Sequence, residues 1–222
     1  MSIAQNLQHI KSTLPKHVTL VAVSKTKPIS AILEAYHAGQ RVFGENKIQE
    51  MVDKYDVLPN NIEWHMIGHV QKNKVKYMAS FVSLIHGVDD YKLLEEINKQ
   101  AKKNERIINC LLQIKIASED SKFGMTAEEA SGIIQSKAFS ELKHVKIVGV
   151  MGMATFTDDQ VQIKKEFTLL KFIFDGLKPL KTFNFQPETI SMGMSGDYQL
   201  AIASGSTMVR LGSSIFGERN YN

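Results

Sequence analysis

Residues 18–28 read VTLVAVSKTKP, a run of apolar residues that ends in a short polar turn before a proline. Consecutive apolar residues are typical of a strand that is covered on both faces, as in a parallel sheet with helices outside. In an open, doubly wound sheet the first strand usually leads into the glycine-rich G-x-G-x-x-G loop of a dinucleotide site. The SKTKP turn lacks that loop, so this stretch favours the other parallel architecture, a closed barrel.

Similar apolar runs alternate with segments of helical periodicity along the chain. They predict eight strands, at residues 18–23, 41–43, 62–67, 81–86, 107–116, 145–151, 188–192 and 206–211. Eight such repeats, preceded by a helix at about residues 2–13, predict an α/β fold: a single (β/α)8 TIM barrel in which residues 1–222 form one domain. Two segments, TAEE at 126–129 and TDDQ at 157–160, have the spacing of helix capping boxes.

The composition is that of an ordinary globular protein, with 43% hydrophobic and 23% charged residues among 222. The 27 basic and 23 acidic residues leave a net charge of +4 and a pI of about 9.0, but they interleave along the helical segments, as on a solvated surface. We therefore expect no nucleic-acid partner. No apolar stretch approaches the roughly 20 residues of a membrane span, and the N-terminal segment has no signal-peptide core.

The single cysteine, Cys110, lies in the apolar run IINCLLQIKI, which predicts a buried thiol rather than a nucleophile. One cysteine also cannot form an internal disulfide, as suits a reducing compartment. The sequence therefore predicts a cytoplasmic protein. A monomer is favoured because no long exposed apolar seam is visible.

In a (β/α)8 barrel the ligand binds at the C-terminal ends of the strands. Lys25 follows the first predicted strand, so we expect its stem to lie among apolar residues and its amine to face the barrel mouth. A partly desolvated lysine loses proton affinity and becomes a nucleophile that forms Schiff bases with aldehydes or ketones. A rim lysine in a salt bridge is the alternative interpretation. Lys27, just before Pro28, is expected to point to solvent.

Two late segments resemble a phosphate cup. Ser195 and Gly196 precede the predicted helix DYQLAIAS, and Gly212 and Ser213 precede another short helical turn, so both segments can direct backbone amides at an anion. Strands seven and eight are a recurrent phosphate site of this fold. Ordinary tight turns between strand and helix, which also favour Gly and Ser, are the alternative.

Arg210 is a fixed cation inside the apolar eighth strand STMVRL. A buried arginine needs an acceptor, either a carboxylate or a ligand atom such as a ring nitrogen or a phosphate oxygen. His65 and His69 have a spacing that would suit a metal on a helix, but they straddle a strand end and lack the glutamate of the HExxH motif. The sequence therefore predicts no metal site.

These features occur within five longer motifs: AVSKTKP (22–28), FGENKIQE (43–50), WHMIGHVQKNK (64–74), GVMGMAT (149–155) and SMGMSGDYQLAIASGSTMVRLGSSIFG (191–217). Through them the chain resembles the pyridoxal phosphate homeostasis protein family over almost its whole length. That family has the alanine racemase N-terminal-domain type of barrel without the second domain of the racemase. Met66, Val70 and Gln199 depart from the family pattern, at positions outside the expected cofactor contacts.

The resemblance implies a binding site for pyridoxal 5'-phosphate and no metal. In that site Lys25 holds the cofactor as an internal aldimine, and Arg210 faces the pyridine nitrogen. The resemblance also implies phosphate contacts from Ser195, Gly212 and Ser213, and a pocket lining that includes Asn46, Met151, Met153 and the His65 region.

The resemblance further implies a non-catalytic or weakly active carrier, which buffers the cofactor or delivers it to apo-enzymes. An arginine at the ring nitrogen makes the cofactor a weaker electron sink than an aspartate would. An amino-acid racemase is the alternative, and it would need a second base such as Tyr77, Tyr91 or His69. In the racemases an extra domain helps to supply that base, and we expect 222 residues to leave no room for it. A cofactor-free Schiff-base aldolase is a third possibility, in which Arg210 has no evident role.

Overall fold

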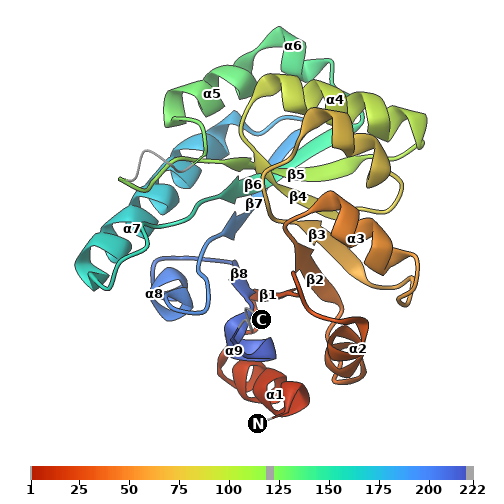
Figure 1. Ribbon diagram of the computed structural model, residues 1–222. Coiled ribbons are helices and arrows are strands. Elements are labelled where there is room, and N and C mark those ends of the chain that lie inside the picture. Colours follow the sequence, from red (N-terminus) through yellow and green to blue (C-terminus); the bar gives the residue numbers. More distant parts are fainter. Residues whose placement is uncertain (1, 119–122, 219–222) are drawn as a thin grey trace.

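The computed structural model describes residues 2–118 and 123–218, and its centre is a closed barrel of eight parallel strands. Each strand pairs with the next along the chain, and the last strand closes the ring by pairing with the first. The helices surround the strands (Figure 1). The predicted (β/α)8 barrel with an additional N-terminal helix is therefore confirmed.

The strands are β1 (Thr19–Val23), β2 (Val42–Glu45), β3 (Glu63–Met66), β4 (Leu84–Val88), β5 (Ile108–Gln113), β6 (Val145–Met151), β7 (Phe185–Ser191) and β8 (Met208–Leu211). The α-helices are α1 (Ile3–Thr13), α2 (Ile29–His37), α3 (Ile48–Tyr55), α4 (Tyr91–Lys103), α5 (Ala127–Gln135), α6 (Lys137–Ser140), α7 (Gln160–Leu177), α8 (Tyr198–Ala203) and α9 (Ser213–Phe216). Two short 3-10 helices are η1 (Lys72–Tyr77) and η2 (Lys178–Leu180). None of the helices in this described part of the chain is long and apolar enough to cross a membrane.

All eight predicted strands are present, and the largest boundary differences have local causes. Phe81 ends the turn that follows η1, and the Val82 amide still donates back to the Met78 carbonyl at 2.9 Å, so β4 begins at Leu84. β7 begins earlier than predicted because Phe185 pairs with Ile147, ahead of a register shift between Ile147 and Gly149. Gln186 and Pro187 interrupt the apolar pattern, so this part of β7 has no strand signal in the sequence.

Most of the core lies between the barrel and its helices. On α7 one apolar stripe faces the barrel and is buried, as its spacing in the sequence indicates. Its members are Ile163, Phe167, Leu170, Phe174 and Leu177. A smaller cluster fills the barrel interior and consists of Val21, Leu84, Leu111, Met151 and Met208. The interior also holds buried polar side chains, among them His65, His86 and Arg210, which lead to the site described below.

The capping prediction is right for α5 and wrong for α7. Thr126 and Glu129 form the reciprocal capping box of α5. The N-cap of α7 is Asp159, whose carboxylate accepts from the amides of Val161 and Gln162, and not Thr157. Aspartate is an equally good cap, and Thr157 instead accepts from the Asp159 amide at 3.2 Å, one step before the helix begins.

Candidate functional site

A cavity of about 530 Å3 opens at the C-terminal ends of the strands. Six of the residues that the sequence predicts for the site line it: Lys25, Asn46, Ser195, Arg210, Gly212 and Ser213. Met151 does not line it, which corrects the expected lining at one position. Met151 ends β6 with its side chain in the interior cluster, and Met153 and Ala154, which follow it, form the wall instead.

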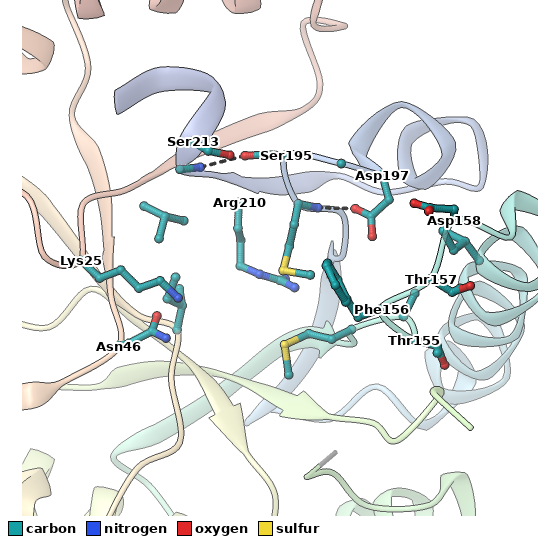
Figure 2. Close-up of a pocket in the computed structure, with 18 of the residues that line it drawn as sticks. Lys25, Asn46, Thr155, Phe156, Thr157, Asp158, Ser195, Asp197, Arg210 and Ser213 are labelled. Atoms are coloured by element: carbon teal, nitrogen blue, oxygen red, sulfur yellow. Dashed lines mark hydrogen bonds between the residues drawn. The ribbon is translucent and has the colours of Figure 1, made fainter. Parts of the chain in front are cut away.

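Lys25 and Asn46 enter the cavity from neighbouring strands. β1 and β2 run parallel with Val23 opposite Gly44, so the residues that follow each strand emerge side by side. The Ser24 amide continues this pairing by donating to the Gly44 carbonyl at 3.0 Å. Figure 2 shows both side chains reaching into the cavity from the same side. An amine and an amide are thus presented together at this end of the cavity.

Ser195 lies opposite the start of α9. Its Oγ accepts hydrogen bonds from the amides of Gly212 (3.2 Å) and Ser214 (3.4 Å). These amides belong to the first turn of α9, where they have no carbonyl partner within the helix. The hydroxyl and the amides therefore converge at one corner of the cavity (Figure 2), as expected for a site that accepts anionic oxygens.

The backbone after β7 requires glycine at one position. Gly193 has φ +98°, and a Cβ there would lie 2.6 Å from the Cβ of Ala201 in α8. The Gly193 carbonyl accepts from the Arg210 amide at 2.9 Å, which ties this loop to β8. The loop then turns at Asp197, whose carboxylate accepts from the Met194 amide at 2.6 Å. This geometry brings Ser195 to the end of β8.

Arg210 lies between the two ends of the cavity (Figure 2) and is 4% exposed. Its guanidinium donates to Ser191 O (2.8 Å), Ser191 Oγ (2.6 Å) and Gly152 O (3.1 Å), so three of its five N–H groups have partners here. Among the described residues no ion pair involves Arg210. Burial lowers the pKa of Arg210 to about 10, while the Asp197 carboxylate opposes that shift. Arg210 is therefore a cation at neutral pH whose remaining donors can meet a ligand acceptor.

A chain of buried polar groups continues from Arg210 across the barrel interior. Ser191 Oγ lies 3.0 Å from Nδ1 of His86, and Nε2 of His86 lies 3.1 Å from Nδ1 of His65. Burial lowers the pKa of His65 to about 3 and holds the pKa of His86 well below its usual value, so both rings are neutral. His65 therefore supports Arg210 through this chain, and Ile67 is the residue of the expected His65 region that lines the cavity. The sequence offered no signal for His86 or Ser191 beyond their place in strands.

The loop between β6 and α7 forms the opposite wall, with Thr155, Phe156, Thr157 and Asp158 (Figure 2). Glu166 of α7 anchors this loop, because its carboxylate accepts from the amide and the hydroxyl of Thr155, both at 2.7 Å. Burial opposes ionisation of this carboxyl, but the hydrogen bonds outweigh it and lower the pKa of Glu166. The sequence analysis missed Glu166, which looked like one polar residue of a solvated helix face.

The position of Lys27 differs from the one predicted from the sequence. Its Nζ donates to the carbonyls of Phe216 and Gly217, both at 3.1 Å, and Lys27 lines the cavity instead of pointing to solvent. A lysine is well placed there because it satisfies carbonyls at the C-terminal end of α9. This contact links the turn after β1 to the segment after β8.

The remaining polar candidates lie elsewhere. His69 stacks on Phe123 with ring centroids 4.5 Å apart, and its Nδ1 lies 3.4 Å from the Asp89 carboxylate. Neither His69 nor Tyr77 nor Tyr91 lines the cavity. In the ranges that the structure describes, no three histidine, cysteine or acidic side chains are grouped so as to hold a metal ion.

Comparison with known proteins adds three findings. A family model described as "Alanine racemase, N-terminal domain" matches residues 1–220. The pyridoxal phosphate homeostasis protein of Haemophilus influenzae is 42% identical over 208 residues, which cover 92% of this chain and 86% of that protein. The protein of the same name from Escherichia coli K12 is 37% identical and covers 99% of this chain and 98% of its own length.

Solved structures give the same relationship. PipY of Synechococcus elongatus without PLP matches with a TM-score of 0.91 at 33% identity, over 97% of this chain and 100% of that chain. PipY with PLP bound matches with a TM-score of 0.88 over the same shares. Alanine racemase of E. faecalis matches with a TM-score of 0.76 at 15% identity, over 98% of this chain and 58% of that chain, so it shares the fold alone.

Proposed function

The chain belongs to the pyridoxal phosphate homeostasis protein family, which has the alanine racemase N-terminal-domain barrel, and we propose that it binds pyridoxal 5'-phosphate in the cavity at the barrel mouth. It acts in vitamin B6 homeostasis by holding the cofactor and releasing it to apo-enzymes. The observation that carries this proposal is Arg210, a buried cation that faces the same cavity as Lys25 and forms no ion pair within residues 2–118 and 123–218.

The residues of the cavity match the chemical groups of this cofactor. Lys25 supplies an amine for the aldehyde, Arg210 supplies donors for the ring nitrogen, and Ser195 with the amides of the α9 turn meets the phosphate. Apolar side chains of Val23, Ile67, Met153 and Met194 also line the cavity and can cover the faces of an aromatic ring. Because Ser195 and the amides of the α9 turn already form a place for the phosphate, Lys25 and Arg210 are available for the other polar groups of the ligand.

When bound, pyridoxal 5'-phosphate supplies an aldehyde, with which a lysine amine condenses reversibly by forming a carbon–nitrogen double bond and losing water. Lys25 is positioned to be that amine. Arg210 keeps its proton and only donates, so it leaves the ring nitrogen as an acceptor and provides no carboxylate to protonate it. This pairing favours holding the cofactor over using it as a strong electron sink.

The lining also supports carriage rather than racemisation. Exchange of a proton on both faces of an amino acid needs a base on each face. Besides Lys25, Lys27 and Arg210, the titratable side chains among the described residues that line the cavity are Asp158 and Asp197, whereas the candidates for a second base, Tyr77, Tyr91 and His69, do not line it. A protein with this lining is at most a weak racemase. An aldolase without cofactor would leave Arg210 without a function.

We further propose that the protein works as a monomer in the cytoplasm. The buried thiol of Cys110 and the reversible nature of the lysine linkage are compatible with a carrier in a reducing compartment. Delivery requires only that an apo-enzyme binds the cofactor more tightly than this cavity does, so no particular partner is implied.

Spectral titration with pyridoxal 5'-phosphate tests the proposal. The wild-type protein should develop the absorbance band of a lysine-bound cofactor, and borohydride should fix the cofactor on the peptide that contains Lys25. Lys25→Ala should lose both signals, whereas Lys47→Ala, which removes an exposed lysine beside Asn46, should keep them. An unchanged band in Lys25→Ala would contradict the assignment. Deuterium exchange at the α-carbon of amino acids, measured above the free-cofactor rate, would instead favour the racemase.

A further inference from the structure

Charged side chains of α3 hold the backbone on both sides of Lys25. Nζ of Lys54 donates to the Ser24 carbonyl at 2.8 Å, and the Thr26 amide donates to Oε1 of Glu50 at 2.6 Å. These are the two peptide groups that flank Lys25. Its backbone is therefore fixed in orientation from outside the barrel, while its side chain extends into the cavity.

Lys54 is the centre of this arrangement. Besides the Ser24 carbonyl, its Nζ donates to Oε1 of Glu45 at 2.8 Å and to Oε1 of Glu50 at 2.7 Å. Ser24 adds a fourth link, because its hydroxyl donates to the same oxygen of Glu45 at 2.6 Å. All three ammonium protons of Lys54 are used, and each goes to the turn or to a residue that also contacts the turn.

The turn itself needs such support. The Lys27 amide donates to the Ser24 carbonyl at 3.0 Å across four residues, and Thr26, the third of them, has φ +64°. That position of a type II turn normally takes glycine, and a β-branched residue is strained there. Hydrogen bonds from Lys54 and Glu50 hold the turn in this conformation, from which Lys25 projects.

Stability alone does not explain the arrangement. Lys54 is 5% exposed and Glu45 is fully buried, and a buried ion pair often stabilises no better than apolar side chains of the same volume. Glu45 also retains one oxygen, Oε2, without a hydrogen-bond partner. Because this cluster adds little to the stability of the fold, its role is better explained by the conformation that it imposes on the turn at residues 24–27.

We propose that Lys54 and Glu50 are positioning residues, which fix the turn at residues 24–27 so that the Lys25 amine is aligned for the aldehyde before the cofactor arrives. The proposal rests on the proposed function of Lys25. It predicts that loss of the support slows the covalent step without weakening the non-covalent binding of the phosphate and ring, because neither Lys54 nor Glu50 lines the cavity.

Two measurements separate these effects. The rate of covalent capture is followed with pyridoxal 5'-phosphate, and non-covalent affinity is measured with 4'-deoxypyridoxine 5'-phosphate, which has no aldehyde. Lys54→Met and Glu50→Ala should slow capture about tenfold or more, since misplacement of a reacting group by about 1 Å can have such an effect, while the Kd of the analogue stays unchanged. Glu50→Gln, which keeps an oxygen for the Thr26 amide, should recover part of the rate.

Lys171→Met is the matched control, because Lys171 also forms an ion pair with an acidic residue four positions away, Asp175, on the exposed face of α7. It should leave both measurements unchanged. If Lys54→Met does not fold, Glu50→Ala, whose side chain is 25% exposed, decides the question. Unchanged capture, or equal loss of capture and analogue affinity, overturns the positioning role. Failure of the wild-type protein to be labelled at Lys25 overturns the proposed function instead.

Discussion

Acidification should destabilise this barrel through the two histidines that it buries without charge. His86 is fully buried and His65 is 4% exposed, and each lies within hydrogen-bond distance of the other. Burial lowers the pKa of His65 to about 3, and burial together with His65 and Arg210 holds the pKa of His86 well below its usual value. The unfolded chain has no such constraint, so its histidines titrate at about pH 6.5.

The hydrogen bonds also fix where each ring carries its proton. Arg210 can only donate, so Ser191 Oγ accepts from it and has its own proton left for Nδ1 of His86. In the arrangement that gives the Ser191 hydroxyl proton an acceptor, His86 carries its own proton on Nε2, which donates to Nδ1 of His65. Both rings are therefore expected as neutral Nε2–H tautomers.

The size of the effect follows from the pKa values. Between the native pKa of His65, about 3, and the unfolded value, the unfolded state binds a proton that the native state does not, so stability falls as pH falls. Above the unfolded pKa the full stability is present. A histidine with a native pKa of about 3, as for His65, lowers the free energy of unfolding by about 2 kcal/mol between pH 7 and pH 5, and His86 lowers it further in the same direction.

Urea unfolding at the two pH values measures this, with His86→Gln as the variant and His9→Gln, an exposed histidine of α1, as the control. His86→Gln should make the loss of stability between pH 7 and pH 5 smaller, and His9→Gln should leave it as it is. Nitrogen-15 NMR should find both buried rings neutral at pH 5 and protonated on Nε2. A ring that titrates near pH 6.5, or an Nδ1–H tautomer at His86, would refute the argument.

Three further predictions concern single positions. Gly149→Ala should prevent folding, as judged by circular dichroism, because its Cβ would lie 1.8 Å from the Thr189 carbonyl oxygen, whereas Gly132→Ala, with nothing within 4 Å, should raise the melting temperature. Cys110 should react with thiol reagents only after unfolding, since burial raises the pKa of its thiol; reaction in the native protein at the unfolded rate would contradict this. Arg210→Met should weaken pyridoxal 5'-phosphate binding in equilibrium dialysis by roughly 10- to 100-fold, the equivalent of one charge-assisted hydrogen bond, and an unchanged Kd would exclude a contact with the cofactor.

The strands could be predicted because burial on both faces makes each of them an apolar run. The predicted strand ends were wrong where an apolar residue is buried outside a strand or where a polar residue pairs within one. Phe81 and Val82 are apolar but lie in and just after a turn that precedes β4, and Gln186 is polar but lies in β7. A local pattern reports burial, and these residues show that burial alone does not distinguish a strand from a packed turn.

The site residues could be predicted where they follow directly from strand ends, as Lys25, Asn46 and Arg210 do. Residues that act on the site from elsewhere had no such signal. Lys54 and Ser24 are 30 residues apart and meet only because α3 packs outside β2 and β3. Met151 is a residue that was predicted for the cavity lining but does not line it. It was expected there because it lies inside a motif, but its position in β6 directs its side chain into the interior cluster.

The buried charges of this barrel all lie near one end. Among the described residues, the buried acidic and basic side chains other than the neutral histidines His65 and His86 are Glu45, Lys54, Glu166 and Arg210. Each of them holds backbone or side chains at the cavity: the turn of Lys25, the wall at Thr155 and the interior of β7. Because a buried charge lowers stability unless it is fully paired, an even distribution would be expected if these groups served only the fold. Their concentration at the C-terminal face indicates that these charged groups serve to position the residues of the cavity, although burying them lowers the free energy of unfolding. At the opposite end of the barrel the fold is maintained by apolar packing.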